Sequence, residues 1–170
     1  MTFNKKESGF SIVDLIITMA IIGIISVTAI PSLKEWSKNY NVQSAAMDLY
    51  SHMQAAKLGS IKENKEWSIN FAPEGIVGYQ VIHKVNNVDQ AVKTVDFGKR
   101  YNGEIQYAHP TETTSYDAPT ISFLPNGLIK TTNVGYVYIS NKSKSSYYRV
   151  GMPYASSSVK IEKRDGTQWK

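Results

Sequence analysis

The 170-residue sequence predicts an α+β protein in which a long N-terminal helix packs on an antiparallel β-sheet head. After a short polar stretch, an apolar run extends from Phe10 to Pro31. Apolar residues then recur at steps of three and four as far as Ala56, which is the spacing of an amphipathic helix. From Trp67 onward the pattern changes to short alternating stretches separated by turn residues, which is typical of antiparallel strands.

The apolar run has the length of a membrane span. The 22 residues from Phe10 to Pro31 reach about 33 Å as a helix, and the hydrocarbon core of a bilayer is about 30 Å thick. Lys5 and Lys6 precede the run, so the positive-inside bias keeps the N-terminus cytoplasmic. We therefore expect a single-pass protein whose C-terminal head lies outside.

Asp14 is the charged residue inside this run. A carboxylate costs about 2.5 to 3.5 kcal/mol at mid-membrane on insertion scales, and less near the end of the span. Asp14 is therefore a candidate functional residue, and the alternative is an acid that merely reaches the headgroup layer. The whole run could also be a secretory signal cleaved after Ala29, but a discarded segment has no need of an acid.

Composition and motifs argue against an enzyme. The balance of 19 Lys and Arg against 14 Asp and Glu gives a net charge of +5, which is mildly basic. The chain has no cysteine, which excludes a disulfide framework and thiolate zinc sites. No nucleophile elbow or phosphate-binding loop is present, and His52, His83 and His109 lack ligand spacing. We expect no catalytic residue, no metal and no cofactor.

The stretch from Gly9 to Ile16, Gly-Phe-Ser-Ile-Val-Asp-Leu-Ile, resembles the N-terminal processing site of type IV pilins and of the pseudopilins of type II secretion. The resemblance implies cleavage after Gly9 by a prepilin peptidase and N-methylation of Phe10. Counted from Phe10, Asp14 is the fifth mature residue, where the family usually has Glu. Pro31 is the twenty-second, where such pilins commonly have a helix-kinking proline.

Asp14 and Pro31 are the residues expected to act in assembly. Once cleavage frees the amine of Phe10, pairing this cation with Asp14, within or between subunits, offsets the cost of burying either charge in an apolar bundle and fixes the axial register. Pro31 lacks a backbone N–H and clashes with the carbonyl four residues back, so we expect a kink or a locally melted turn. The alternative is a helix that ends at Pro31.

Two further stretches are similar to the GspH/FimT branch of this family. One extends from Ser44 to Lys57 and continues with Ile61 to Asn64; the other, Ile121 to Gly127, reads apolar-x-Phe-x-Pro-Asn-Gly. The sequence then predicts four segments: a leader peptide at 1–9, a transmembrane and assembly helix at 10–31, the amphipathic half of the stem helix at 32–64, and a β-rich, pilin-like head at 65–170.

The head is predicted to consist of antiparallel strands joined by tight turns. Asn102-Gly103, Pro125 to Gly127 and Asp165-Gly166 supply residues that tolerate left-handed turn geometry. The segment from Ala108 to Pro119, rich in Pro, Thr and Ser, is expected to be an exposed loop. The expected strands are 67–71, 78–84, 92–97, 104–107, 120–123, 135–140, 147–151 and 158–162.

Basic and aromatic residues cluster near the C-terminus, and such a surface can neutralise phosphates and stack bases. The ordinary interpretation is that tyrosine favours strands and that lysine keeps an outer sheet face soluble. Some FimT-like minor pilins bind DNA in natural transformation through a basic Gly-Arg-x-Arg motif near the C-terminus, which this chain lacks in its tail. The candidate nucleic-acid contacts are Lys160, Lys163 and Arg164.

The resemblance implies a non-enzymatic filament subunit, either a minor pilin of a type IV pilus or a GspH-type pseudopilin of a type II secretion system. Such a subunit is held in the inner membrane, with the head periplasmic or extracellular, and then enters a pilus or pseudopilus. The implied partners are other pilins or pseudopilins, the prepilin peptidase, the inner-membrane assembly platform and the lipid bilayer. Two alternatives remain, a DNA-binding FimT-like minor pilin and an ordinary secreted β-domain cleaved after Ala29.

Overall fold

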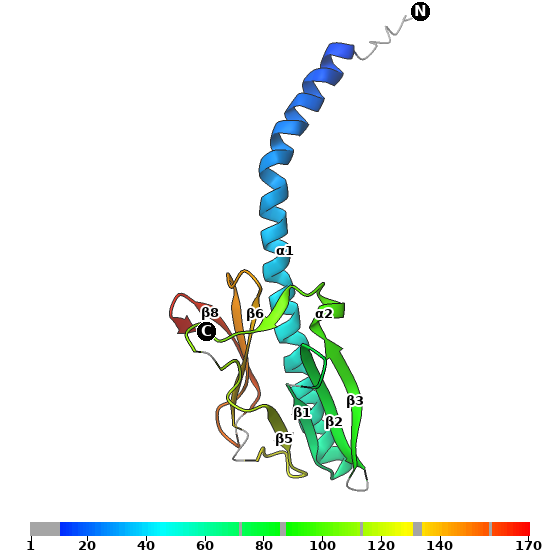
Figure 1. Ribbon diagram of the computed structural model, residues 1–170, viewed down its shortest axis with the longest axis vertical. Coiled ribbons are helices and arrows are strands. Elements are labelled where there is room, and N and C mark those ends of the chain that lie inside the picture. Colours follow the sequence, from blue (N-terminus) through cyan, green and yellow to red (C-terminus); the bar gives the residue numbers. More distant parts are fainter. Residues whose placement is uncertain (1–10, 72, 86–87, 113, 131–133, 157) are drawn as a thin grey trace, which may run out of the picture. The chain divides into compact units, whose positions relative to one another are not determined.

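The computed structural model describes residues 11–71, 73–85, 88–112, 114–130, 134–156 and 158–170 (Figure 1). The predicted processing residues, Gly9 and Phe10, lie outside this set. The chain divides into two compact units, Met1–Ser37 and Lys38–Lys170.

One helix, α1 (Ile12–Glu63), takes up 52 residues and contributes to both units. It ends at Asn64, whose φ of 52° is the left-handed conformation that commonly closes a helix. The Lys65 N–H donates to the Ser60 carbonyl at 3.2 Å and so satisfies one of the last carbonyls of the helix. The helix continues through Pro31, which differs from the alternative that it ends there.

The first sheet has four antiparallel strands in the order β3-β2-β1-β5. In β1, Trp67 lies opposite His83 of β2 on one side and Phe123 of β5 on the other. A register shift between Val81 and Ile82 interrupts the pairing of β2 with the edge strand β3, and such a bulge discourages the pairing of an exposed edge with other chains. The strands are β1 (Trp67–Asn70), β2 (Gly78–Val85), β3 (Val88–Asp96) and β5 (Thr120–Phe123).

The second sheet is antiparallel and has the order β4-β6-β7-β8-β9. Its central strands are largely buried: every residue from Val137 to Asn141 in β6 is buried, as is Val150 in β7, while Tyr136 and Arg149 are half-buried. The strands are β4 (Ile105–Tyr107), β6 (Gly135–Asn141), β7 (Tyr147–Met152), β8 (Lys160–Asp165) and β9 (Gln168–Trp169).

Both sheets and the C-terminal half of α1 contribute to one hydrophobic core in the second unit (Figure 1). The helix contributes the residues that the spacing predicted, all fully buried: Val42, Ala45, Leu49, Met53 and Ala56. Burying a Leu or Met side chain contributes roughly 1.5 to 3 kcal/mol, so this face is what joins the helix to the sheets. The structure is the α+β, pilin-like arrangement that the sequence predicted.

Most strands begin or end one to three residues from the predicted position, β9 was not predicted, and the largest difference lies at the start of β3. The strand β3 begins at Val88 rather than at 92, since an exposed edge strand has no buried face to give an alternating pattern. Phe97 was expected in this strand but begins the short helix α2 (Phe97–Arg100). The Asp96 carboxylate caps α2 by accepting from the N–H groups of Gly98 at 2.8 Å and Lys99 at 3.3 Å.

The segment 108–119 is only partly the exposed loop that was expected. The Ala108 N–H donates to the Tyr138 carbonyl, and the Tyr138 N–H donates to the Ser115 carbonyl, at 3.1 and 2.9 Å. Asp117 continues this pattern by donating its N–H to Tyr136 at 2.9 Å. Both ends of the segment therefore lie along β6, and Ala108 and Ala118 are buried. The exposed described residues are Thr111, Glu112, Thr114, Asp117 and Pro119.

Candidate assembly helix and its anchorage in the head

The N-terminal part of α1 presents apolar side chains on all sides. It is the one helix among the described residues that is long and apolar enough to cross a membrane, and none of its most apolar window is buried. An apolar surface of this length requires lipid or other apolar helices around it. The exposed large apolar residues between the start of α1 and Leu33 are Ile12, Val13, Leu15, Ile16, Ile17, Met19, Ile21, Ile22, Ile24, Ile25, Val27, Ile30 and Leu33.

Asp14 lies in the first turn of α1, close to the cap. The Val13 N–H donates to the hydroxyl of Ser11 at 3.2 Å, and the N–H groups of Asp14 and Leu15 donate to the Ser11 carbonyl. An acid three residues after a serine cap is a common signature of a helix start, and negative charge is favourable there because of the helix dipole. Within residues 11–170, no described side chain forms an ion pair or hydrogen bond with its carboxylate.

The two hydroxyl groups of this segment that the structure describes within the helix are satisfied internally. Thr18 donates its hydroxyl to the Leu15 carbonyl at 2.8 Å, and Ser26 donates to the Ile22 carbonyl at 2.7 Å. Such bonds let hydroxyls enter an apolar environment without another partner. Unlike these hydroxyl groups, the Asp14 carboxylate has no partner among the described residues, so a partner would have to come from outside them.

Gly23 and Pro31 are the two residues of this segment with unusual backbone properties. Apart from Gly23 itself, its two neighbours and the adjacent helix backbone, no described atom lies within 4 Å of the position that a Cβ on Gly23 would take, so no contact inside the chain requires a glycine here. Pro31 has no N–H to donate to Val27, which leaves the helix weaker at that turn. Both features suit a helix whose contacts lie in an assembly.

Asp48 fixes the other half of α1 to the C-terminal end of α2. Its carboxylate accepts from the Tyr101 hydroxyl at 2.8 Å and pairs with Arg100 at 2.7 Å. Burial, followed by the hydrogen bond to Asp48, raises the pKa of Tyr101 to about 12. One turn on, His52 Nδ1 and the Tyr79 hydroxyl are hydrogen-bonded at 2.7 Å, and burial lowers the pKa of His52.

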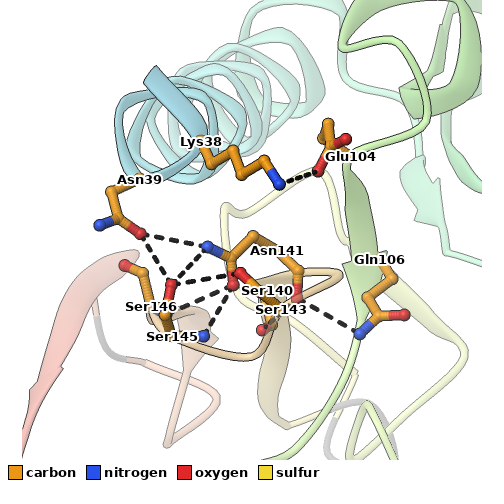
Figure 2. A network of polar contacts seen from close by, with 9 residues as sticks. All are labelled: Lys38, Asn39, Glu104, Gln106, Ser140, Asn141, Ser143, Ser145 and Ser146. Carbon is orange, nitrogen blue, oxygen red and sulfur yellow. Dashed lines mark hydrogen bonds and ion pairs between the residues drawn. The ribbon is translucent and has the colours of Figure 1, made fainter. Parts of the chain in front are cut away.

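A polar network begins at the first residues of the second unit (Figure 2). Its centre is the fully buried Asn141 at the end of β6. The Asn141 side chain donates to Asn39 Oδ1 at 3.1 Å and to the Ser145 hydroxyl at 2.8 Å, and it accepts from the N–H of Ser145 at 2.9 Å. The Ser146 N–H adds a longer bond at 3.4 Å, and Gln106 donates to the Asn141 carbonyl at 3.3 Å.

Glu104 provides a second connection beside the network around Asn141. Lys38 Nζ lies 3.8 Å from Glu104, and the Lys142 N–H donates to the Glu104 carbonyl at 2.9 Å. The turn between β6 and β7 is thereby attached both to α1 at residues 38 and 39 and to the segment that leads into β4. The beginning of the second unit is fixed by polar contacts, whereas the rest of the helix in that unit is fixed by apolar packing.

The predicted nucleic-acid contacts do not share one surface. Lys160 and Lys163 are three residues apart in β8, so their side chains extend to opposite faces of the sheet. Arg164 donates its Nε–H to the Gly166 carbonyl at 2.8 Å and lies over the Tyr147 ring. Arg149, their basic neighbour in β7, is paired with Glu162 at 2.5 Å.

The model of one protein family, the type II transport protein GspH, matches residues 45–152. The match extends from the buried face of α1 to the end of β7 and covers more than half of the chain. The chain belongs to the GspH family. Comparison with curated proteins and with solved structures finds no match.

Membership in the GspH family gives this chain a structural, pilin-type role in type II secretion or in a pilus. The family is one of structural pseudopilins that associate with one another in a filament. The apolar part of α1 agrees with a subunit that is anchored in a membrane by a single helix. The family match does not include Asp14, Pro31, Lys160, Lys163 or Arg164, so their roles rest on the chain's own physical chemistry.

Sequence reasoning missed the network around Asn141. In the sequence Asn141 opens the run Asn-Lys-Ser-Lys-Ser-Ser, which has the composition of an exposed turn. Its partner Asn39 is 102 residues earlier, and no local pattern connects the two. The one local signal was the length of the predicted hairpin turn, which leaves room for an asparagine to bond to the backbone of the turn.

Proposed function

We propose that this chain is a minor pilin or a GspH-type pseudopilin that is cleaved after Gly9, methylated on Phe10, stored in the inner membrane and assembled through α1. The observation that carries the proposal is that one continuous helix is apolar and exposed in its first half and forms part of the head core in its second half. The first half suits lipid in storage and the helices of other subunits in a filament, because both surroundings are apolar.

Asp14 and Pro31 take the two assembly roles. The carboxylate of Asp14 pairs with the amine that cleavage creates at Phe10, which gives an axial alignment that apolar contacts alone cannot give. Pro31 supplies a turn that lacks a hydrogen bond, where the helix can bend or unwind as the subunit leaves the bilayer. The prepilin peptidase and the inner-membrane assembly platform are the partners for these steps.

The experiment that tests this proposal is the mass of the mature N-terminus from membranes of the native host. We expect a chain that begins at Phe10 with one added methyl group. A chain that begins at Ile30 would show an ordinary secretory signal, and one that begins at Met1 would show that no processing takes place; either result contradicts the proposal. A type IV pilus is then distinguished from a secretion system by the ATPase and secretin genes beside this one.

A further inference from the structure

The positive charge of the chain is concentrated at its C-terminal end. Residues 141–170 contain seven Lys and Arg but two Asp and Glu, an excess of five that accounts for the whole net charge of +5. Both acids are already paired, Glu162 with Arg149 and Asp165 with Lys170, each at 2.5 Å. The basic residues that remain in this segment are Lys142, Lys144, Lys160, Lys163 and Arg164.

Two of these residues, Lys142 and Lys144, lie in a turn that is bonded to the beginning of the second unit. The turn that carries Lys142 and Lys144 is bonded to Asn39 through Asn141 and Ser145 (Figure 2). The Lys142 Nζ lies 3.6 Å from the position that a Cβ on Gly103 would take, beside Glu104 and its partner Lys38.

Arg164 completes the group. It lines the same hollow as Ser145, whose hydroxyl donates to Asn39 at 3.2 Å. Lys38 precedes Asn39 in α1, Lys142 and Lys144 lie in the turn that is bonded to Asn39, and Arg164 lines the hollow beside Ser145; we call these four residues the basic collar.

We propose that the basic collar docks on anionic phospholipid headgroups of the membrane that holds the apolar part of α1. The inference rests on the proposed function, because it requires that part of the helix to be inserted. Seven residues separate Ile30 from Lys38, about 12 Å as a helix and at most about 28 Å fully extended. The collar is thus held near the headgroup layer by the covalent chain, whatever the angle between head and helix.

The residues around Lys38 support a lipid surface as the partner. Trp36 and Tyr40 lie on either side of it in the sequence and both are exposed, and these two residue types are enriched at the interface between membrane and water. Lys142 and Lys144 are exposed, and no described carboxylate forms an ion pair with either. Two acids oppose the collar: Glu104 pairs with Lys38 at 3.8 Å, and Glu112 lines the same hollow as Lys144.

The test uses the full chain reconstituted through its helix into vesicles of phosphatidylcholine alone, or of phosphatidylcholine mixed equally with phosphatidylglycerol. The chain has no cysteine, so Ser143→Cys provides a single site for a fluorescent donor in the exposed turn, with an acceptor dye on a lipid headgroup. We expect stronger energy transfer in the anionic vesicles, and we expect high salt to remove the difference because exposed charges are screened.

Two double variants locate the effect. Lys142→Gln with Lys144→Gln should reduce docking in anionic vesicles by roughly 25-fold, at about five-fold per basic residue. The matched control is Lys62→Gln with Lys65→Gln, which removes the same charge at the other end of α1, about 36 Å from Lys38 along the helix. The control should dock as the unmodified chain does.

Other outcomes would overturn the inference. Equal energy transfer in neutral and anionic vesicles, or equal losses in the two double variants, would show that the collar does not recognise lipid. If the collar variant lost binding of a labelled oligonucleotide while its docking on anionic lipid stayed intact, the surface would be a nucleic-acid site instead. Flotation of the vesicles measures insertion separately, so a chain that fails to float contradicts the proposed function rather than this inference.

Discussion

Among single residues, Asn141 has the most demanding environment, because it is fully buried and its side chain bonds to two other segments. Asn141→Ala leaves the N–H groups of Ser145 and Ser146 without their side-chain acceptor and removes one of the two donors to Asn39, and an unsatisfied buried group costs about 1 to 3 kcal/mol. We expect a loss of unfolding free energy of that size. Urea unfolding of the full chain in detergent micelles, followed by near-UV circular dichroism, measures it.

Ser143 in the same turn provides the comparison. It is exposed and makes one long contact, 3.4 Å, with the Ser145 hydroxyl. Ser143→Ala should change the unfolding free energy by less than about 0.5 kcal/mol. Equal effects of the two substitutions would show that the network around Asn141 does not stabilise the head.

His52 makes the stability of the head depend on pH. Burial lowers its pKa below the ordinary 6.5, Asp48 opposes this shift, and Lys93 and Arg100 add to it. The unfolded chain therefore binds more protons than the folded one between the two pKa values, so stability is full above pH 6.5 and falls as the pH drops through the folded pKa. His52→Gln should give a shallower fall in unfolding free energy between about pH 7 and pH 5. An unchanged pH profile in that variant would contradict the assignment.

At the scale of elements, the spacing of apolar residues correctly predicted which face of α1 is buried. The residues Val42, Leu49 and Met53 were placed on one face by their spacing, and the structure buries all three. Where burial does not act, the sequence was a weaker guide: seven residues of β3 are exposed, and α2 is four residues long, too short for any helical period to appear. The Asp96 cap was the one local signal for α2.

The contact between β2 and β3 gives a test at this scale. A Cβ on Gly78 would lie 1.9 Å from the Val95 carbonyl oxygen, which is backbone and cannot move aside alone. Gly78→Ala should therefore separate the two strands locally and lower the unfolding free energy by about 1 to 3 kcal/mol, the usual cost of overpacking. Thr94→Ala, on the exposed edge strand beside it, should be close to neutral. A neutral Gly78→Ala would mean that this pairing is looser than the structure shows.

At the scale of the whole molecule, features formed by neighbouring residues could be predicted from the sequence, whereas contacts between residues far apart in the chain could not. The apolar segment, Asp14 and Pro31 are local features that can be found in the sequence alone, and the assembly roles of Asp14 and Pro31 stay predictions. The anchorage of α1 joins Asn39 to Asn141 and Asp48 to Tyr101, pairs 102 and 53 residues apart that only the folded chain brings together. The same holds for the basic collar, whose members come from α1, the turn after β6 and β8.

Asp14 links the two environments that the chain must occupy. In lipid the carboxylate is a cost of about 2.5 to 3.5 kcal/mol at mid-membrane, so Asp14→Ala should insert at least as well as the unmodified chain. In the proposed filament of processed subunits, the same substitution would leave the Phe10 amine buried without a partner, at about 3 to 5 kcal/mol per subunit. We therefore expect normal amounts of membrane-inserted subunit and a severe loss of filaments, counted by electron microscopy of sheared material. Asp14→Glu keeps the charge and should assemble, whereas filaments undiminished in Asp14→Ala would show that this carboxylate does not set the register.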